Sequence, residues 1–205
     1  MITVLNLGTA NIGSVLNMLR RIRVPAMVAE GAEDIEKASK IIMPGVGHFS
    51  NSAERLGALP YREALDHAAL VDKKPILGIC LGMQLMTRGS EEGQGAGLGW
   101  VPADTVRFRA ERVAEKLLIP HMGWNDVAVE KPSALVDGLD AKSRYYFCHS
   151  YHVECDDPAH VLMTTSHGYT FTSSFQVGNL TGVQFHPEKS LRFGMRLLER
   201  FAEAG

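Results

Sequence analysis

The stretch that decides the fold reads PILGICLG and spans residues 75–82. Residues 75–79 form a short apolar run, which predicts a buried strand, and residues 81–87 follow at once with a helical pattern. Glycines at 78 and 82 flank Cys80, so the stretch matches the G-x-nucleophile-x-G turn that joins a strand directly to a helix. We therefore expect a parallel strand with Cys80 at its carboxyl end.

The first half of the chain repeats this alternation of strand and helix. Short apolar runs predict further strands over residues 2–7, 24–29 and 40–43. Amphipathic patterns predict helices over residues 11–21, 50–56 and 61–71. Asn11 is the expected N-cap of the first helix, and Pro44 is expected to end the third strand. Because strands alternate with helices, we expect a mostly parallel central sheet with helices on both faces.

The second half has a different character, which begins after Glu91. Residues 93–99 form a glycine-rich loop. The segments beyond it predict strands over residues 105–108, 126–129, 145–153, 160–165, 171–176 and 181–185. A final amphipathic helix is predicted over residues 191–201. We expect one α/β domain over residues 1–205, whose second half is rich in antiparallel strands.

Composition excludes several classes of protein. The 205 residues include 21 Lys and Arg against 23 Asp and Glu, a balance that predicts no nucleic-acid or anionic-membrane partner. No apolar run approaches the roughly 18–20 residues of a membrane span, and residues 1–6 lack the basic start of a secretory signal. Three cysteines cannot form a closed disulfide framework. We therefore expect a reduced, cytoplasmic compartment.

Cys80 is the candidate nucleophile. A thiol at a helix N-terminus lies at the positive end of the helix dipole, which favours the thiolate, and the backbone N–H of Leu81 would point at an oxyanion. The alternative is a buried structural cysteine between two packing glycines. A catalytic role therefore requires a base elsewhere in the chain.

The candidate base is His186, in the sequence His186-Pro187-Glu188 at the end of a predicted strand. Residues two apart in extended backbone project to the same side, so Glu188 could accept a hydrogen bond from one ring nitrogen while the other faces Cys80. The alternative is a strand-end turn with a solvated charge pair.

A glycine-rich turn, MPGVG over residues 43–47, follows another predicted parallel strand. It would lie on the same rim as Cys80, because the carboxyl ends of parallel strands meet at one edge of the sheet. Its glycines allow backbone N–H groups to turn toward a substrate as a second oxyanion donor. The alternative is a tight turn without chemistry.

Taken together, three segments resemble the class I, or triad, glutamine amidotransferases: PGVG at 44–47, GICLGMQ at 78–84 and GVQFHPE at 182–188. The order of the motifs matches that family over nearly the whole chain. Three further segments are similar to the glutaminase subunits of imidazole glycerol phosphate synthase: GTANIGSV at 8–15, PHMGWN at 120–125 and YYFCHSY at 145–151.

The resemblance implies a flavodoxin-like fold and an enzyme that hydrolyses glutamine to glutamate and ammonia through a Cys80 thioester. His186 would relay protons, Glu188 would orient it, and amides around Val46, Gly47 and Leu81 would hold the oxyanion. The ammonia would pass to a (β/α)₈-barrel cyclase subunit of a heterodimer. That partner makes imidazole glycerol phosphate and an aminoimidazole carboxamide nucleotide.

The same resemblance implies two sets of binding residues. Those expected to contact glutamine are Gly45, Gln84, Glu92, Ser150 and Tyr151. Those expected to face the partner subunit are Thr9, Asn11, Trp124 and Lys189. Without the family, Gln84 would be interpreted as a partly exposed helix residue and Trp124 as ordinary core.

The chain departs from the family's pattern at three places. Asn6-Leu7 stands where many members carry Asp-Tyr, Thr9 where some carry proline, and Cys148 where an aliphatic residue is usual. These departures leave open a paralogue that supplies ammonia for amidination of a sugar in surface-polysaccharide synthesis. Two other possibilities are a non-catalytic, redox-sensing module on the same fold and the small subunit of another amidotransferase, such as anthranilate synthase.

Residues 148–155, CHSYHVEC, superficially resemble a zinc-binding sequence. Strand alternation predicts that Cys148 and His152 face one side and that His149 and Cys155 face the other. Four ligands divided between two faces cannot converge on one zinc ion. We therefore expect no metal and no cofactor.

Overall fold

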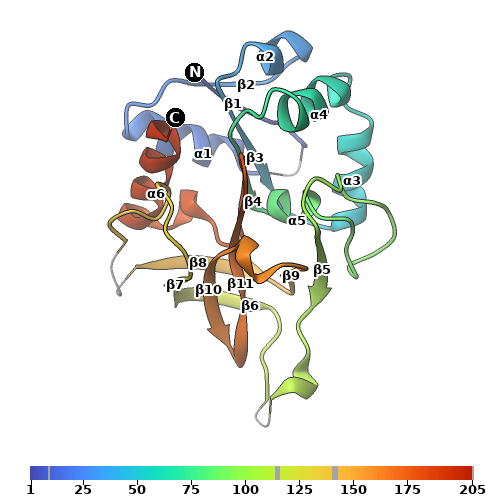
Figure 1. The fold of residues 1–205 in the computed structure, drawn as a ribbon, viewed down its shortest axis with the longest axis vertical. Coiled ribbons are helices and arrows are strands. Elements are labelled where there is room, and N and C mark those ends of the chain that lie inside the picture. The colour runs from blue at the N-terminus through green and yellow to red at the C-terminus, as the bar shows by residue number, and fades with distance from the viewer. Residues whose placement is uncertain (9, 114–115, 140–142, 205) are drawn as a thin grey trace.

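A twisted sheet runs through both halves of the chain in the computed structural model, which describes residues 1–8, 10–113, 116–139 and 143–204 (Figure 1). Within these residues its strand order is β2–β1–β3–β4–β12–β11–β10–β7, with β9 and β5 attached beside β11. The first five strands in that order are parallel. Their bounds are Ala26–Val28 for β2, Ile2–Val4 for β1, Lys40–Gly45 for β3, Ile76–Cys80 for β4 and Leu180–Val183 for β12.

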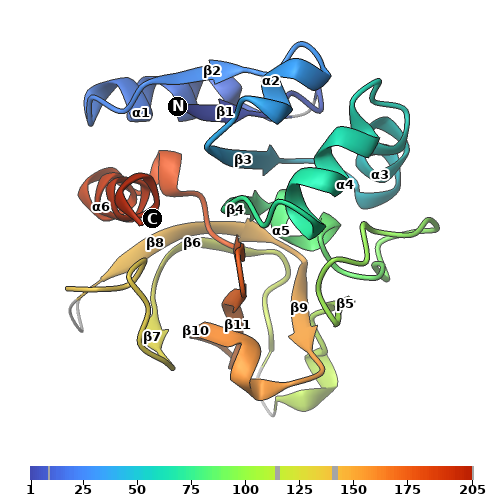
Figure 2. The same ribbon diagram turned by 45° about the horizontal axis from the view of Figure 1, so that its top comes forward.

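Helices cover both faces of the parallel half, as the alternating pattern predicts (Figures 1 and 2). On one side lie α1 (Ile12–Arg21) and α6 (Leu191–Glu203). On the other lie α2 (Ala32–Glu36), α3 (Phe49–Gly57), α4 (Arg62–Leu70) and α5 (Leu81–Leu85). The strands divide their side chains between these two cores: Ile41 and Met43 pack toward one, and Ile42 toward the other.

The second half is antiparallel. Strand β12 pairs with β11 (Tyr169–Val177), which pairs with β10 (Val161–His167) and touches β9 (Tyr151–Cys155). Strand β10 also pairs with β7 (Ala128–Val129), and β9 with β5 (Ala103–Arg107). A separate ribbon pairs β6 (His121–Asp126) with β8 (Arg144–His149). Short 3₁₀ turns lie at Ala110–Arg112, Pro158–His160 and Pro187–Lys189.

Several predicted elements are confirmed, one strand end and one undivided strand are wrong, and the helix α2 and the strand β6 were not predicted. Asn11 caps α1 by accepting a hydrogen bond from the Ser14 amide at 3.2 Å. The predicted end of β3 at Pro44 is wrong, because the strand continues to Gly45 and Pro44 pairs with Ile79. The predicted single strand over 145–153 is divided at Ser150 into β8 and β9. The short helix α2 was missed because five residues are too few to show a helical period.

Phe108, three buried histidines and the partly exposed His167 form an aromatic cluster within the antiparallel half. The centroid of the Phe108 ring lies 5.3 Å from that of His149, 4.8 Å from that of His152 and 5.2 Å from that of His167. His121 stacks on His167 at 4.2 Å, and its Nδ1 lies 3.1 Å from Nε2 of His149. Burial lowers the pKa of His121 to about 4, with a smaller contribution from His167. Burial also lowers the pKa of His149 and His152, so the fold holds these imidazoles neutral.

The contact between α6 and the turn at Pro187–Lys189 leaves no room for a side chain at Gly194. A Cβ atom there would lie 1.8 Å from the carbonyl oxygen of Pro187. Gly194→Ala should therefore destabilise the protein by about 2 kcal/mol, although alanine is the better helix former. Gly57→Ala at the end of α3 is the matched control, because nothing lies within 4 Å of its new Cβ. Urea unfolding measures both, and a Gly194→Ala variant as stable as the wild type would contradict this packing.

The depressed pKa of His121 predicts how stability depends on pH. Between the ordinary pKa of 6.5 and the folded value of about 4, the unfolded chain binds a proton at this residue and the folded chain does not. The free energy of unfolding should therefore fall as the pH is lowered through this window. His121→Gln should reduce that slope by up to about 1.4 kcal/mol per pH unit, the contribution of one proton. Urea titrations at pH 4 to 7 give the slope, with His67→Gln as the solvent-exposed control. An unchanged slope in His121→Gln would count against a neutral His121.

Candidate active site

The backbone turns sharply at Cys80, the last residue of β4. Cys80 has φ +53° and ψ −109°, a strained conformation for a residue other than glycine, and α5 begins at Leu81. The flanking glycines make the turn possible because the backbone passes so closely. A Cβ on Gly82 would lie 1.8 Å from the carbonyl oxygen of Met43, and one on Gly78 would lie 2.7 Å from the amide nitrogen of Met83. The predicted strand-to-helix turn is confirmed.

The ends of three neighbouring strands bring the predicted segments together. In β3, Gly45 pairs with Cys80 of β4, and the turn that carries Val46 and Gly47 follows directly. On the other side of β4, Val183 of β12 pairs with Ile79. The residues that follow β12 therefore lie beside Cys80.

His186 and Glu188 form a buried pair next to Cys80. Nδ1 of His186 lies 2.7 Å from Oε1 of Glu188, and their side chains are 3% and 5% exposed. The imidazole and Cys80 line the same cavity, and the two side chains are close enough for Cys80 to affect the pKa of His186. Burial lowers the pKa of His186, but the charge and hydrogen bond of Cys80, together with those of Glu188, outweigh it and raise the pKa to about 10. The imidazole is therefore held as a cation between two groups that carry negative charge when ionised.

A cavity of about 420 Å³ opens over these side chains. The predicted residues that line it are Val46, Gly47, Cys80, Leu81, Gln84, Glu92, Ser150, Tyr151, His186 and Lys189. Gly45 is not among the lining residues; a Cβ atom on it would lie 2.8 Å from the Gly82 amide nitrogen, so the backbone passes closely here. Three further lining residues, Pro120, Cys148 and His149, were not predicted, although each lies within or beside a segment that carried the family resemblance. A cavity of this size with a few converging polar groups suits a small ligand.

Gln84 is held at the wall of the cavity by two oxygen atoms. Its Nε2 donates to the Tyr151 carbonyl oxygen at 3.2 Å and to Oε1 of Gln184 at 3.1 Å. The side-chain oxygen of Gln84 therefore remains to accept from a ligand. Glu92 is anchored differently, because its Oε2 accepts the Phe49 amide at the start of α3, at 2.8 Å.

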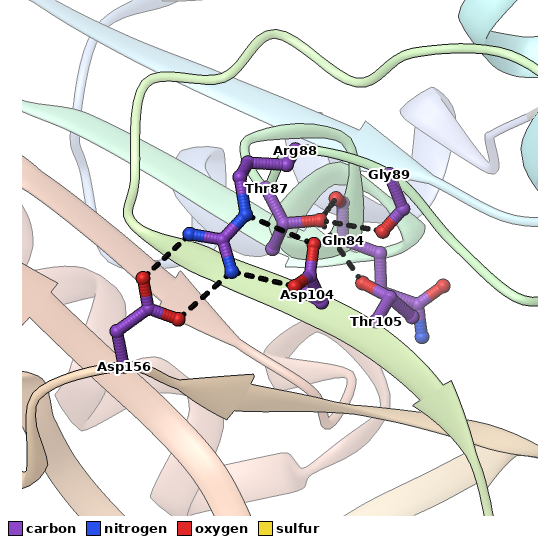
Figure 3. Close-up of polar contacts among 7 residues, drawn as sticks. All are labelled: Gln84, Thr87, Arg88, Gly89, Asp104, Thr105 and Asp156. Atoms are coloured by element: carbon purple, nitrogen blue, oxygen red, sulfur yellow. Dashed lines mark hydrogen bonds and ion pairs between the residues drawn. The ribbon is translucent and has the colours of Figure 1, made fainter.

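The end of α5 is fixed to the antiparallel half by the polar contacts in Figure 3. Arg88 forms paired hydrogen bonds with Asp104 on β5 and with Asp156 just after β9. The Thr87 hydroxyl lies 2.7 Å from the Gln84 carbonyl oxygen and 3.2 Å from the Thr105 hydroxyl. These contacts tie the helix that carries Gln84 to the strand that begins at Tyr151.

Trp124 and Lys189, two of the residues expected at a partner interface, both contact the ring of Tyr146. Trp124 is 43% exposed and packs edge-on against Tyr146, with ring centroids 6.4 Å apart. The Lys189 ammonium lies 5.6 Å from the centroid of the same Tyr146 ring. The interpretation of Trp124 as ordinary core is therefore wrong. Asn11 is exposed at the start of α1, and Thr9 lies outside the described residues.

The predicted alternation over residues 148–155 is wrong. Because the strand is divided at Ser150, His149 and His152 both pack against Phe108 instead of facing opposite sides. Within the part of the chain that the structure describes, no group of three or more His, Cys, Asp or Glu side chains is placed to hold a metal ion. No helix among the described residues is long and apolar enough to span a membrane.

Comparison with known proteins shows the family to which the chain belongs. The sequence model of the family "Glutamine amidotransferase class-I" matches residues 3–204. Imidazole glycerol phosphate synthase subunit HisH 2 of Methanococcus maripaludis is 45% identical over 201 residues, which cover 98% of both chains. Subunit HisH 2 of Pseudomonas aeruginosa is 42% identical and covers 99% of both, and subunit HisH of Bdellovibrio bacteriovorus is 43% identical over 99% of this chain and all of its own.

Solved structures share the fold at low sequence identity. A crystal structure described as glutamine amidotransferase superposes with a TM-score of 0.75 at 19% identity, covering 98% of this chain and 97% of its own. PurLQS from Thermotoga maritima gives 0.73 at 16% identity, covering 98% and 96%. The chain belongs to the class I glutamine amidotransferase family, in which the relatives that it matches over almost their full length are HisH subunits of imidazole glycerol phosphate synthase.

Proposed function

We propose that this chain is the glutaminase subunit of an imidazole glycerol phosphate synthase and that Cys80, His186 and Glu188 are its catalytic triad. The observation that carries the proposal is the buried, hydrogen-bonded pair of His186 and Glu188 next to Cys80, with His186 and Cys80 lining one cavity. A nucleophile, a proton carrier and a buried carboxylate in this order are the elements of covalent amide hydrolysis.

In the first half of the reaction, the Cys80 thiolate attacks the side-chain carbonyl carbon of glutamine, and an S–C bond forms. Backbone N–H groups at Leu81 and in the turn at Val46 and Gly47 would stabilise the oxyanion. His186 then gives its proton to the amide nitrogen. The C–N bond breaks, ammonia leaves, and a γ-glutamyl thioester remains on Cys80.

In the second half, water attacks the thioester carbon and gives a proton to His186, which is neutral after the first step. The C–S bond breaks, glutamate leaves, and the thiolate and imidazolium are restored. Glu188 holds the ring through Nδ1 at both stages, so the other ring nitrogen keeps facing Cys80.

The cavity wall supplies groups that suit the other end of glutamine. The side-chain oxygen of Gln84 and the carboxylate of Glu92 are acceptors for the α-ammonium group, and Ser150 and Tyr151 line the cavity next to Gln84. We therefore assign Gln84, Glu92, Ser150 and Tyr151 to substrate binding, with Gly45 supporting the turn.

We further propose that the ammonia passes to a (β/α)₈-barrel cyclase subunit, because the relatives are named as subunits of a synthase. The docking face would include Asn11, Trp124, Lys189 and the segment at Thr9. Lys189 both lines the cavity and contacts the ring on which Trp124 packs, so a partner seated there would close the cavity against water. Residues 1–205 would act as a single amidotransferase domain, which the sheet that joins both halves supports. We propose that this domain works in a cytoplasmic heterodimer with the cyclase.

Replacement of the proposed nucleophile gives the direct test. Cys80→Ala should lower glutamine hydrolysis by the complex by several orders of magnitude, because no thioester can form. Synthesis of imidazole glycerol phosphate from added ammonia should remain, since that chemistry belongs to the partner. Glutamate release and cyclised product are the two measurements.

The controls for this test are the other two cysteines. Cys148→Ala and Cys155→Ala should both stay active, although Cys148 lines the cavity. Near-normal glutamine turnover by Cys80→Ala would refute the assignment of the nucleophile. Hydrolysis of glutamine without any cyclised product, in the presence of the cyclase, would favour a different ammonia acceptor.

The docking face has its own test. Trp124→Ala should weaken binding of the cyclase by about 2 kcal/mol, which is about thirtyfold in Kd, if the exposed indole is an anchor. Calorimetric titration measures the Kd, and the ratio of glutamate to cyclised product measures the coupling. Val129→Ala on β7 is the matched control because Val129 is 44% exposed. Wild-type affinity and coupling in Trp124→Ala would place the interface elsewhere.

A further inference from the structure

Gln184 lies beside the nucleophile and is fully buried. It is the first residue after β12, and Val183 before it pairs with Ile79, so Gln184 and Cys80 are adjacent in the extended register. Its backbone amide donates to the Ser173 carbonyl at 2.9 Å, which fixes the chain at this point. Gln184 also precedes His186 by two residues, so both side chains project toward Cys80.

The orientation of the Gln184 amide follows from a backbone carbonyl that cannot rotate. Tyr151 offers an oxygen to Gln84, so the amino group of Gln84 must face it. The same amino group lies 3.1 Å from the Gln184 side chain, which must therefore present its oxygen there. The amino group of Gln184 is then directed to Sγ of Cys80, at 3.7 Å.

We propose that Gln184 is a further catalytic residue of the glutaminase: its amino group donates a hydrogen bond to the Cys80 thiolate, while its oxygen holds Gln84 at the glutamine pocket. The inference rests on the proposed function, since it takes Cys80 as the nucleophile. A hydrogen bond to the anionic form of a group favours that form, so Gln184 stabilises the thiolate before glutamine binds.

A neutral amide suits this position because the cavity that Cys80 lines already holds charged groups. His186 faces Cys80 from beyond β12 and is backed by Glu188, while Glu92 and Lys189 line the same cavity. A second cation beside the sulfur would oppose the protonated state of His186. Gln184 adds a donor without adding charge, and it joins the nucleophile to the substrate-binding Gln84 through two hydrogen bonds.

The test uses two variants of similar length in the full chain. Gln184→Met removes both the donor and the acceptor, whereas Gln184→Glu keeps an oxygen for Gln84 and places negative charge near the sulfur. Iodoacetamide labelling of Cys80, followed by peptide mass spectrometry from pH 5 to 10, reports the thiolate. The pH midpoint of labelling should rise by about one unit in Gln184→Met and further in Gln184→Glu, so that labelling below the midpoint is at least about tenfold slower.

Steady-state kinetics with the cyclase subunit separate the two roles. Both variants should lose kcat for glutamine hydrolysis, about tenfold or more, because less thiolate is present. Only Gln184→Met should also raise KM for glutamine, because it leaves Gln84 with one of its two acceptors. Gln176→Met and Gln176→Glu on β11 are the matched controls and should keep the wild-type midpoint, kcat and KM.

If both Gln184 variants fail to fold, NMR of the Gln184 side-chain amide in the wild-type protein still tests the inference. In ¹⁵N-labelled protein, the Gln184 side-chain amide resonances should shift at the same pH midpoint as Cys80 labelling, and Cys80→Ala should abolish that shift. Folded variants whose midpoints stay within about 0.3 pH unit of the wild type, or amide resonances indifferent to Cys80, would overturn the inference.

Failure of this inference and failure of the proposed function give different results. If Cys80→Ala still hydrolyses glutamine, the nucleophile assignment fails, and with it the role of Gln184. If Cys80→Ala is inactive while both Gln184 variants label and turn over as the wild type does, the triad stands and the Gln184 inference alone is wrong.

Discussion

The approach of Gly82 to the carbonyl group of Met43 is the constraint on which the rest of the site depends. That contact brings the start of α5 onto β3 with no space for a side chain, and it forces the backbone at Cys80 into its left-handed conformation. The sulfur is thereby placed above the ends of β3 and β12, where the glycine turn and His186 can reach it. The strain at one residue is balanced by the packing of three parallel strands around it.

Two histidines that line the cavity, His149 and His186, have pKa values shifted in opposite directions. Burial and the other histidines hold the pKa of His149 well below its ordinary value, while Cys80 and Glu188 overcome burial and raise that of His186. Because His149 is neutral, it adds no positive charge to the cavity that His186 also lines. The protein therefore raises the pKa of the histidine beside Cys80 and lowers the pKa of the other histidine in the cavity lining.

The sequence predicted most of the parallel half and the central residues of the site, because their signals are local. The apolar run before Cys80, the flanking glycines and the Asn11 cap each act within a few residues of chain. The break at Ser150 carried no such signal, since it depends on two strands that join different sheets, and the error placed His149 and His152 on opposite faces. The role of Gln184 was missed for a similar reason: its partners lie 104 and 100 residues away, and only the fold brings them together.

Strand β12 joins the two halves of the sheet, because it pairs with β4 in parallel on one side and with β11 in antiparallel on the other. Gln184, His186 and Glu188 follow directly after it, so the geometry of the proposed triad depends on how both halves pack against this strand. Local unfolding of either half must displace β4 or β11 from β12, and the side chains of the site would then lose their arrangement. Backbone amides in β12 should consequently exchange with deuterium among the slowest in the chain, and catalytic competence should disappear no later than global structure during unfolding.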